Sequence, residues 1–313
     1  MIAWLLISFF VLLFLGVPIA MSLGLSAMGG ILFLGGGSTV TIAQRMFEGM
    51  NSFALLAIPL YTFAGFTMSK GGISKRLMDF CYSIVGHIYG GLAHVNVLSS
   101  MIFAGISGSA VADTAGVSGM FMPEMVRKGY SKNFTVAVTA ISSTIGIIIP
   151  PSIPMVVIAG ICGISTGKLF LGGIIPGILC GLAQMIVSYF LAKKEGVPKE
   201  PGHFTIGPVL HGLWESWPAL LMPIIIVGTI TMGIVSPTEA GVIAVVYGLF
   251  VGMVIYREVK LKDLFDILVD SAKTTGGIML IVASASLFSF VCTKFGIANA
   301  ASELLASIAH NQF

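Results

Sequence analysis

Small residues, hydroxyls and carboxylates stand together at residues 105–124, inside a chain that is 56% hydrophobic and 9% charged. The stretch reads GISGSAVADTAGVSGMFMPE, and its first acidic residue is Asp113. At membrane depth an ionisable group marks a functional site by default, and irregular backbone is tolerated only inside protein or beside a watery cavity. Residues 143–154 hold three prolines that cannot all lie in an unbroken helix. Two interruptions this close in sequence predict one site built from both.

The helix ends at these two interruptions would offer two kinds of ligand. Free carbonyl groups suit a dehydrated cation, and free N–H groups suit an anionic substrate group. The pattern therefore predicts an all-oxygen sodium site made largely of backbone carbonyls and hydroxyls. Its predicted ligands are Ser107, Gly108, Ser109 and Val111 at the first interruption and Gly146, Ile149 and Pro151 at the second. Each small residue taken alone favours close helix packing instead, but the combination with the prolines favours the site.

Three roles are open for Asp113. Its carboxylate could bind the cation, balance charge at the site, or cap the helix that follows the first interruption. Glu124 is expected to end that helix at the membrane interface, and Glu239 to be a dipole partner in the first turn of a later span. His87 and His94 have no acidic or cysteine partner at a ligand spacing, so we expect no metal site there.

Membrane-spanning helices must position these residues. A mean hydropathy of +1.02 and 39 glycines exclude an ordinary soluble domain and predict an all-α polytopic membrane protein. Residues 87–125 are too long for one span and are interrupted midway, so they predict a re-entrant helical hairpin. Residues 39–51 and 74–86 mix charge with apolar side chains and are expected at the membrane surface. The predicted spans are residues 2–15, 17–36, 52–68, 134–165 with a break, 169–192, 214–234, 236–256 and 275–292.

The distribution of basic residues supports this topology. With the N-terminus outside, three of the 16 Lys and Arg residues fall outside, namely Arg45, Lys168 and Lys294, and the others fall inside. This bias holds only if residues 89–125 return to the cytoplasmic side, because a full span there would reverse everything that follows. The net charge of +3 is small and the basic residues are spread among loops, so nucleic acid is not an expected partner.

The chain also repeats itself weakly. Gly-Val-Pro at 16–18 is echoed by Val-Ser-Pro at 235–237, and Met-Ser-Lys-Gly-Gly-Ile at 68–73 by Cys-Thr-Lys-Phe-Gly-Ile at 292–297. In the topology above the two copies run in opposite directions. Inverted repeats with broken helices that meet near the membrane midplane are typical of transporters.

The repeat predicts how the chain is divided. Residues 1–200 would form the first repeat, with scaffold spans, the hairpin at about 87–125 and the broken helix at about 134–165. Residues 201–313 would hold an incomplete second repeat, with residues 193–217 as the linker. Because the hairpin projects beyond residue 313 in the second copy, we expect a fragment, truncated before its second hairpin, of a protein of about 420 to 430 residues.

Four motifs carry a family resemblance. LLAIPL at 55–60, GGISKRL at 71–77, SGSAVAD at 107–113 and IIPPSIP at 148–154 resemble the large membrane subunit (DctM-like) of tripartite ATP-independent periplasmic (TRAP) transporters, and the resemblance runs over residues 1–313. It implies an elevator-type sodium symporter for organic acid anions, such as C4-dicarboxylates or sialic acid, in the bacterial inner membrane. It also implies a small membrane subunit and a periplasmic solute-binding protein as partners. The family's second hairpin and second Pro-Pro break are absent.

The same resemblance implies that the first hairpin tip and the Pro150-Pro151 break hold one sodium site and one wall of the substrate site. The candidate substrate-binding residues are Ser109, Asp113, Thr114, Pro150 and Pro151. Sodium would order the tip against the broken helix, so that the anion site forms only when the cation is present.

Two other functions stay open at this point. A single-component sodium-coupled anion carrier of a related elevator family would share nearly all of this physics. An intramembrane enzyme using Asp113 would need a second catalytic carboxylate or a metal partner, and the sequence places neither nearby. We therefore expect a transporter rather than an enzyme.

Overall fold

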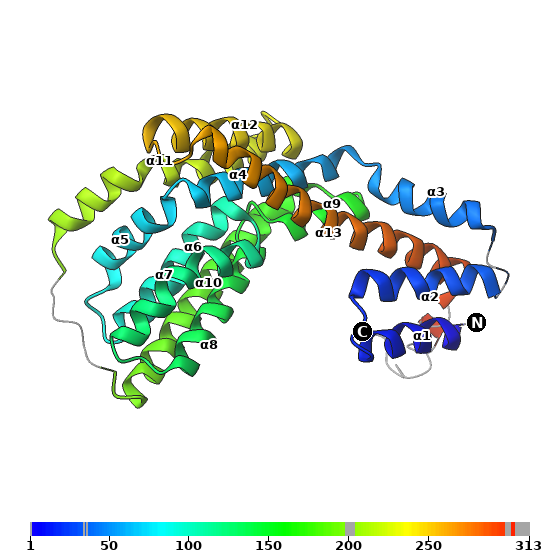
Figure 1. Ribbon diagram of the computed structural model, residues 1–313, viewed down its shortest axis with the longest axis horizontal. Helices are drawn as coiled ribbons and strands as arrows, with labels where there is room; N and C mark the ends of the chain where they lie inside the picture. The colour runs from blue at the N-terminus through cyan, green and yellow to red at the C-terminus, as the bar shows by residue number, and fades with distance from the viewer. Residues whose placement is uncertain (1, 34, 36, 198–203, 298–301, 304–313) are drawn as a thin grey trace. The chain divides into compact units, whose positions relative to one another are not determined.

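The computed structural model describes residues 2–33, 35, 37–197, 204–297 and 302–303 (Figure 1). Most of these residues lie in helices, and there is no strand among them. This confirms an all-α polytopic membrane protein. In the described part of the chain, five helices are long and apolar enough to cross a membrane. They are Phe53–Lys70, Thr166–Lys194, Ile206–Thr231, Pro237–Ile255 and Leu261–Lys294.

The chain folds as two compact units. The first, Met1–Ser52 with Lys273–Phe313, contains α1 (Ile2–Phe14), α2 (Ile19–Phe33), α3 (Thr39–Met50) and the C-terminal part of α13 (Leu261–Lys294). Its apolar core is made by α1, α2 and α13, through Leu5, Ala27, Ile31, Leu287 and Val291.

The second unit, Phe53–Ala272, carries both predicted interruptions. One buried apolar cluster in it joins α5, α6, α7 and α8, through residues such as Cys81, Val95, Phe121 and Phe134. Its elements are η1 (Phe53–Leu56), α4 (Ala57–Lys70), α5 (Ile73–Val85), α6 (Gly91–Ser107), α7 (Ala110–Arg127), α8 (Lys132–Ser143), η2 (Thr144–Ile147), α9 (Ile153–Cys162), α10 (Thr166–Lys194), α11 (Ile206–Thr231), α12 (Pro237–Phe250) and the π-helix η3 (Val251–Ile255), followed by the start of α13.

α1 and α2 lie within the predicted spans 2–15 and 17–36, although their 13 and 15 residues are fewer than the roughly 20 that a full span needs. Two other predicted boundaries are wrong. α11 begins at Ile206 and α13 at Leu261, so residues 193–217 are not all linker and the last span is preceded by further turns of the same helix. The N–H of Lys260 donates to Asp263 Oδ2 at 2.9 Å and so starts α13 early. Apolar composition marks only the apolar part of a helix, and polar turns extend it.

The two sequence echoes fall at equivalent helix boundaries. Pro18 directly precedes α2, and Pro237 is the first residue of α12. α4 is followed by Gly72 with a φ of 70°, and α13 by Gly296 with a φ of 69°. The compact units cut across the repeats, because α4 of the first repeat lies in one unit with α12 of the second. The division at residue 200 stays a prediction.

Candidate functional site

The first predicted interruption is a two-residue turn between α6 and α7. Gly108 has a left-handed backbone with a φ of 63°, and its N–H donates to the Ala104 carbonyl at 3.1 Å. Ser109 is the N-cap of α7, since its Oγ accepts from the N–H of Ala112 at 3.3 Å. The carbonyl end of α6 and the N–H end of α7 therefore meet at one point. α6 and α7 form the predicted helical hairpin, and its re-entrant path through the membrane stays a prediction.

The second interruption separates η2 from α9. The Pro150-Pro151 peptide bond is cis, and Ser152 is the N-cap of α9. The Ser152 Oγ accepts from the N–H of Met155 at 3.3 Å and donates to the Ile147 carbonyl at 2.7 Å. One hydroxyl thus joins both halves of the broken helix.

The hairpin tip contacts this break directly. The N–H of Ile153 donates to the Gly108 carbonyl at 3.0 Å. A Cβ at Gly108 would lie 2.5 Å from the Pro151 carbonyl oxygen, so only glycine fits both the backbone angle and the contact. A Cβ at Gly65 of α4 would lie 3.1 Å from the Ser107 Cα, so α4 also packs closely on the tip. The two interruptions form one junction, as the sequence predicts.

Asp113 is fully buried at this junction. Its Oδ1 accepts from the Ser107 hydroxyl, and the Ser107 Oγ accepts in turn from the Ser109 N–H at 3.2 Å. Its Oδ2 lies against Gly146 of η2 and, within the described residues, has no hydrogen-bond partner. A side chain at Gly146 would collide with this oxygen and would approach the Ala110 nitrogen to 3.2 Å.

Ser109 rather than Asp113 is the N-cap of α7, and Asp113 lies in the first turn of that helix. A buried ionised carboxylate without a paired charge is unfavourable, and a bound cation would remove that penalty. The described chain gives Asp113 no ion pair. The orphaned Oδ2 and the Ser107 hydroxyl are oxygen atoms of the kind that would suit a sodium ion.

Three predicted site residues have side chains that are exposed or contact other parts of the protein. Val111 is 77% exposed on α7. Thr114 is exposed, and its hydroxyl donates to the Ala110 carbonyl of its own helix at 2.8 Å. The Ile149 side chain packs at Gly177 of α10. If these three residues bind the ion or the substrate, they would do so through their backbone groups.

The two other acids have local roles. Glu239 forms a capping box with Ser236, in agreement with its predicted place at a helix N-terminus. Glu124 does not end α7, which continues to Arg127, and the two side chains form an ion pair at 2.5 Å.

Sequence reasoning missed a group of buried polar side chains between α6 and α8. Its members, Asn96, Ser100, Thr139 and Ser142, are at most 2% exposed and are hydrogen-bonded to one another. The available signal was the recurrence of polar residues three to four positions apart in otherwise apolar helices.

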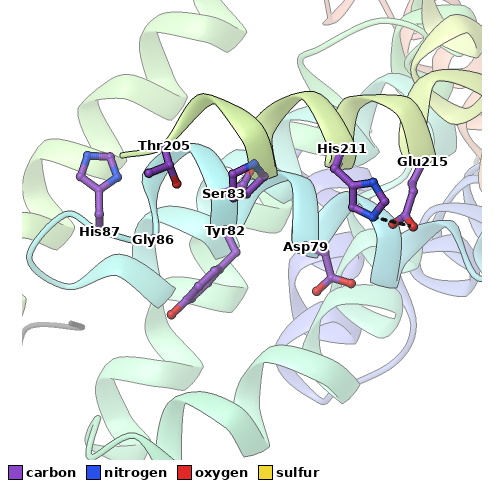
Figure 2. A pocket seen from close by; sticks show the side chains of 10 residues that line it. Asp79, Tyr82, Ser83, Gly86, His87, Thr205, His211 and Glu215 are labelled. Carbon is purple, nitrogen blue, oxygen red and sulfur yellow. Dashed lines mark ion pairs between the residues drawn. The ribbon is translucent and has the colours of Figure 1, made fainter. Parts of the chain in front are cut away.

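A separate pocket of about 370 Å³ lies between α5 and α11 (Figure 2). His211 Nε2 lies 3.3 Å from Glu215 Oε1. Burial raises the pKa of the Asp79 carboxyl, Lys75 lowers it and Glu215 raises it further. The pocket contains none of the predicted sodium or substrate ligands. Its lining is Asp79, Tyr82, Ser83, Gly86, His87, Thr205, Pro208, His211, Gly212 and Glu215.

Comparison with known proteins identifies relatives over most of the chain. The large permease protein of a Pseudomonas aeruginosa C4-dicarboxylate TRAP transporter is 41% identical over 87% of this chain and 64% of its own length. The Vibrio cholerae sialic acid TRAP transporter large permease is 37% identical over 90% of this chain and 66% of its own length. An isethionate TRAP transporter permease of Oleidesulfovibrio alaskensis is 39% identical over 91% of this chain and 45% of its own length. The chain thus spans less than two thirds of these relatives.

The family model described as "Tripartite ATP-independent periplasmic transporter, DctM component" matches residues 6–313. Its match includes both the hairpin and the broken helix. The relatives above are all named as transporter permeases. The chain therefore belongs to the DctM family of TRAP transporter large membrane components.

Proposed function

We propose that this protein is the large membrane subunit of a sodium-coupled symporter that carries organic acid anions across the bacterial inner membrane. The observation that supports it best is the junction of the hairpin tip with the broken helix, where a fully buried carboxylate keeps one oxygen without a hydrogen-bond partner. Family members are named for sialic acid, C4-dicarboxylates and isethionate, all of which are anions.

The cation would occupy the carbonyl side of the junction. Asp113 and the Ser107 hydroxyl, which are hydrogen-bonded to each other, would supply side-chain ligands, and the Pro151 carbonyl, which lies against Gly108, would supply a backbone ligand. Unwound backbone and helix C-terminal ends are the parts of transporters that coordinate sodium. Sodium would also offset the charge of Asp113, which otherwise disfavours any anion nearby.

The anion would occupy the N–H side. Both α7 and α9 begin at the junction, each with a serine N-cap, Ser109 and Ser152. Both helix N-termini carry partial positive charge, which suits a substrate carboxylate. Any free N–H groups would come from the start of α7, because in α9 Ile153 donates to Gly108, residue 154 is proline and Met155 donates to Ser152. The predicted substrate residues Ser109, Pro150 and Pro151 lie at these two starts.

Binding of sodium and binding of the anion would be coupled because the carbonyl side and the N–H side belong to the same junction. Without sodium, Asp113 repels an incoming carboxylate; with sodium bound, that repulsion is cancelled and the tip is tied to the break. The two ligands therefore raise each other's affinity, which is the reciprocity that symport needs. An elevator movement of the hairpin-bearing part, a small membrane subunit and a periplasmic solute-binding protein complete the proposal.

Uptake by reconstituted protein tests this function. The full-length protein with its small subunit would be placed in proteoliposomes, and uptake of labelled C4-dicarboxylates, sialic acid and isethionate followed with and without a sodium gradient and a binding protein. We expect uptake only when both are present. Uptake with sodium alone would favour a single-component carrier, and uptake without a sodium gradient would contradict sodium coupling.

A further inference from the structure

A chain of buried hydrogen bonds joins the first hairpin helix, α6, to the first half of the broken helix, α8. Asn96 Nδ2 donates to Thr139 Oγ1 at 2.8 Å, and Asn96 Oδ1 accepts from the Ser142 hydroxyl at 3.1 Å. The Ser100 hydroxyl donates to Ser142 Oγ at 3.0 Å. Asn96, Ser100 and Ser142 are fully buried and Thr139 is 2% exposed. These four side chains are here called the α6–α8 network.

The network is fixed to backbone on the α8 side. The Thr139 hydroxyl donates to the Thr135 carbonyl at 2.9 Å, and the Ser143 hydroxyl donates to the Thr139 carbonyl at 2.8 Å. Asn96 Nδ2 also lies 3.8 Å from Met125 Sδ of α7. Asn96 therefore lies where both hairpin helices and α8 come together.

Only one axial register of α6 against α8 satisfies this network. The surrounding side chains, such as Ala93, Val97 and Val138, are apolar, and apolar contacts are not directional. Hydrogen bonds are directional, and a buried amide left without partners is strongly disfavoured. A buried asparagine fixes the register of packed helices in the same way in coiled coils.

That register decides whether the tip meets the break. Ser107 follows Asn96 by 11 positions on the same helix, about 16 Å at 1.5 Å per residue. Ser142 precedes Gly146 by only four positions. A slide of one helical turn, about 5.4 Å, would break the Gly108–Ile153 hydrogen bond and move Asp113 away from Gly146.

We propose that Asn96, with Thr139 and Ser142, is a positioning residue that sets the register of the hairpin on the broken helix and so assembles the ion site. The network does not contact the ion itself. The part of this inference that concerns sodium rests on the proposed function, and the part that concerns register does not.

The test compares Asn96→Leu and Thr139→Val with Thr139→Ser, which keeps the hydroxyl, in the full-length protein with its small subunit. Thr67→Val is the matched control, because the buried Thr67 hydroxyl donates only within α4, to the Phe63 carbonyl at 2.8 Å. Hydrogen exchange without sodium reports tip docking through the Ile153 N–H, and sodium titration of uptake reports ion affinity.

We expect Asn96→Leu and Thr139→Val to speed exchange at residues 107–113 and 151–155 while α4 and α12 keep their protection. The sodium concentration for half-maximal uptake should rise about three- to tenfold. Thr139→Ser and Thr67→Val should resemble the wild type in both readouts.

Unchanged exchange at the tip in Asn96→Leu, or an equal increase throughout the protein, would overturn the positioning role. If wild-type uptake ignores sodium but the tip exchange rises locally in Asn96→Leu, the proposed sodium coupling fails and the positioning role stands.

Discussion

At the residue scale, Gly108 combines two constraints that no other residue type meets. Its φ of 63° is a left-handed conformation, and a side chain there would approach the Pro151 carbonyl oxygen to 2.5 Å. Gly163, just after α9, has a similar φ of 65°, but a Cβ added there would have no atom within 4 Å. Comparing substitutions at Gly108 and Gly163 therefore distinguishes the effect of backbone strain from the effect of losing the tip contact.

We predict that Gly108→Ala abolishes uptake and that Gly163→Ala does not. Both variants carry the left-handed strain, about 1–2 kcal/mol, and should lower the thermal unfolding temperature in detergent. Only Gly108→Ala also pushes the tip away from the break, so its unfolding temperature should fall further. Equal uptake by the two variants would show that the tip contact has no functional role.

Asp113→Asn tests the charge at the junction. The amide keeps the size of the side chain and can still accept from the Ser107 hydroxyl, but it removes the negative charge that attracts the cation. We predict that the sodium concentration for half-maximal uptake rises at least about tenfold. Stability in the absence of sodium should not fall, because an unpaired buried charge has been removed.

The control is Glu124→Gln on the same helix, which removes a surface ion pair with Arg127 and should leave sodium affinity unchanged. An unaltered sodium response in Asp113→Asn would remove Asp113 from the ion site.

At the scale of elements, the contact between α5 and α11 carries a pH dependence. A Cβ added at Gly212 would lie 3.1 Å from the Phe80 Cα, so the two helices pack closely there. The Ser216 hydroxyl donates to the Arg76 carbonyl at 3.1 Å. Burial, opposed by Lys75 and reinforced by Glu215, raises the pKa of Asp79 in the same contact. The folded protein therefore holds the Asp79 proton more tightly than the unfolded chain does.

This sign sets the prediction for Asp79→Asn. A raised pKa in the folded state makes stability fall as the pH rises through the range between the ordinary and the raised value. The difference in unfolding temperature, variant minus wild type, should be close to zero at acidic pH and slightly positive at neutral pH. A negative difference at neutral pH would mean that the ionised Asp79 is stabilising. Asp270→Asn on α13 is the control.

α4 and α12 pack closely at a glycine, and α2 and α13 make a similar glycine contact. A Cβ at Gly241 of α12 would lie 2.9 Å from the Leu60 Cβ, and one at Gly24 of α2 would lie 3.3 Å from the Ser284 Oγ. Leu60 and Ser284 are separated by the same number of positions as the second sequence echo, so the two contacts join helices that the predicted repeat relates to each other.

We predict that Gly241→Val lowers the free energy of unfolding by about 1–3 kcal/mol through overpacking. Gly228→Val on α11 is the matched control, since a built Cβ there meets no atom within 4 Å. Unfolding in mixed micelles measures both. Equal effects would show that the change reflects valine in a helix rather than the α4–α12 contact.

The elements also show what sequence alone can and cannot predict. Clustered glycine and serine, and adjacent prolines, strongly disfavour an unbroken helix, so the hairpin turn at Gly108 and the break at Pro150-Pro151 were predictable from local chemistry. Asn96 and Thr139 were missed, because a polar residue in an apolar helix does not reveal its partner on another helix. The starts of α11 and α13 were misplaced, because their first turns are polar and resemble a loop in composition.

At the scale of the whole molecule, one compact unit contains the complete junction, α4 to α9, together with α10, α11 and α12. The hairpin and the broken helix are therefore held by one body, and their contact does not depend on the other unit. In the proposed mechanism this body is the part that moves with the ion and the anion. Binding of sodium inside it would change its local order before any larger movement.

Hydrogen exchange with and without sodium tests this central claim most directly. The wild-type protein and Asp113→Asn would be compared in sodium chloride and in choline chloride of equal ionic strength. The account predicts that sodium slows exchange at residues 107–113 and at the Ile153 N–H in the wild type only. Exchange at the tip that is identical in both salts, or slowed equally in Asp113→Asn, would contradict a sodium site at the junction.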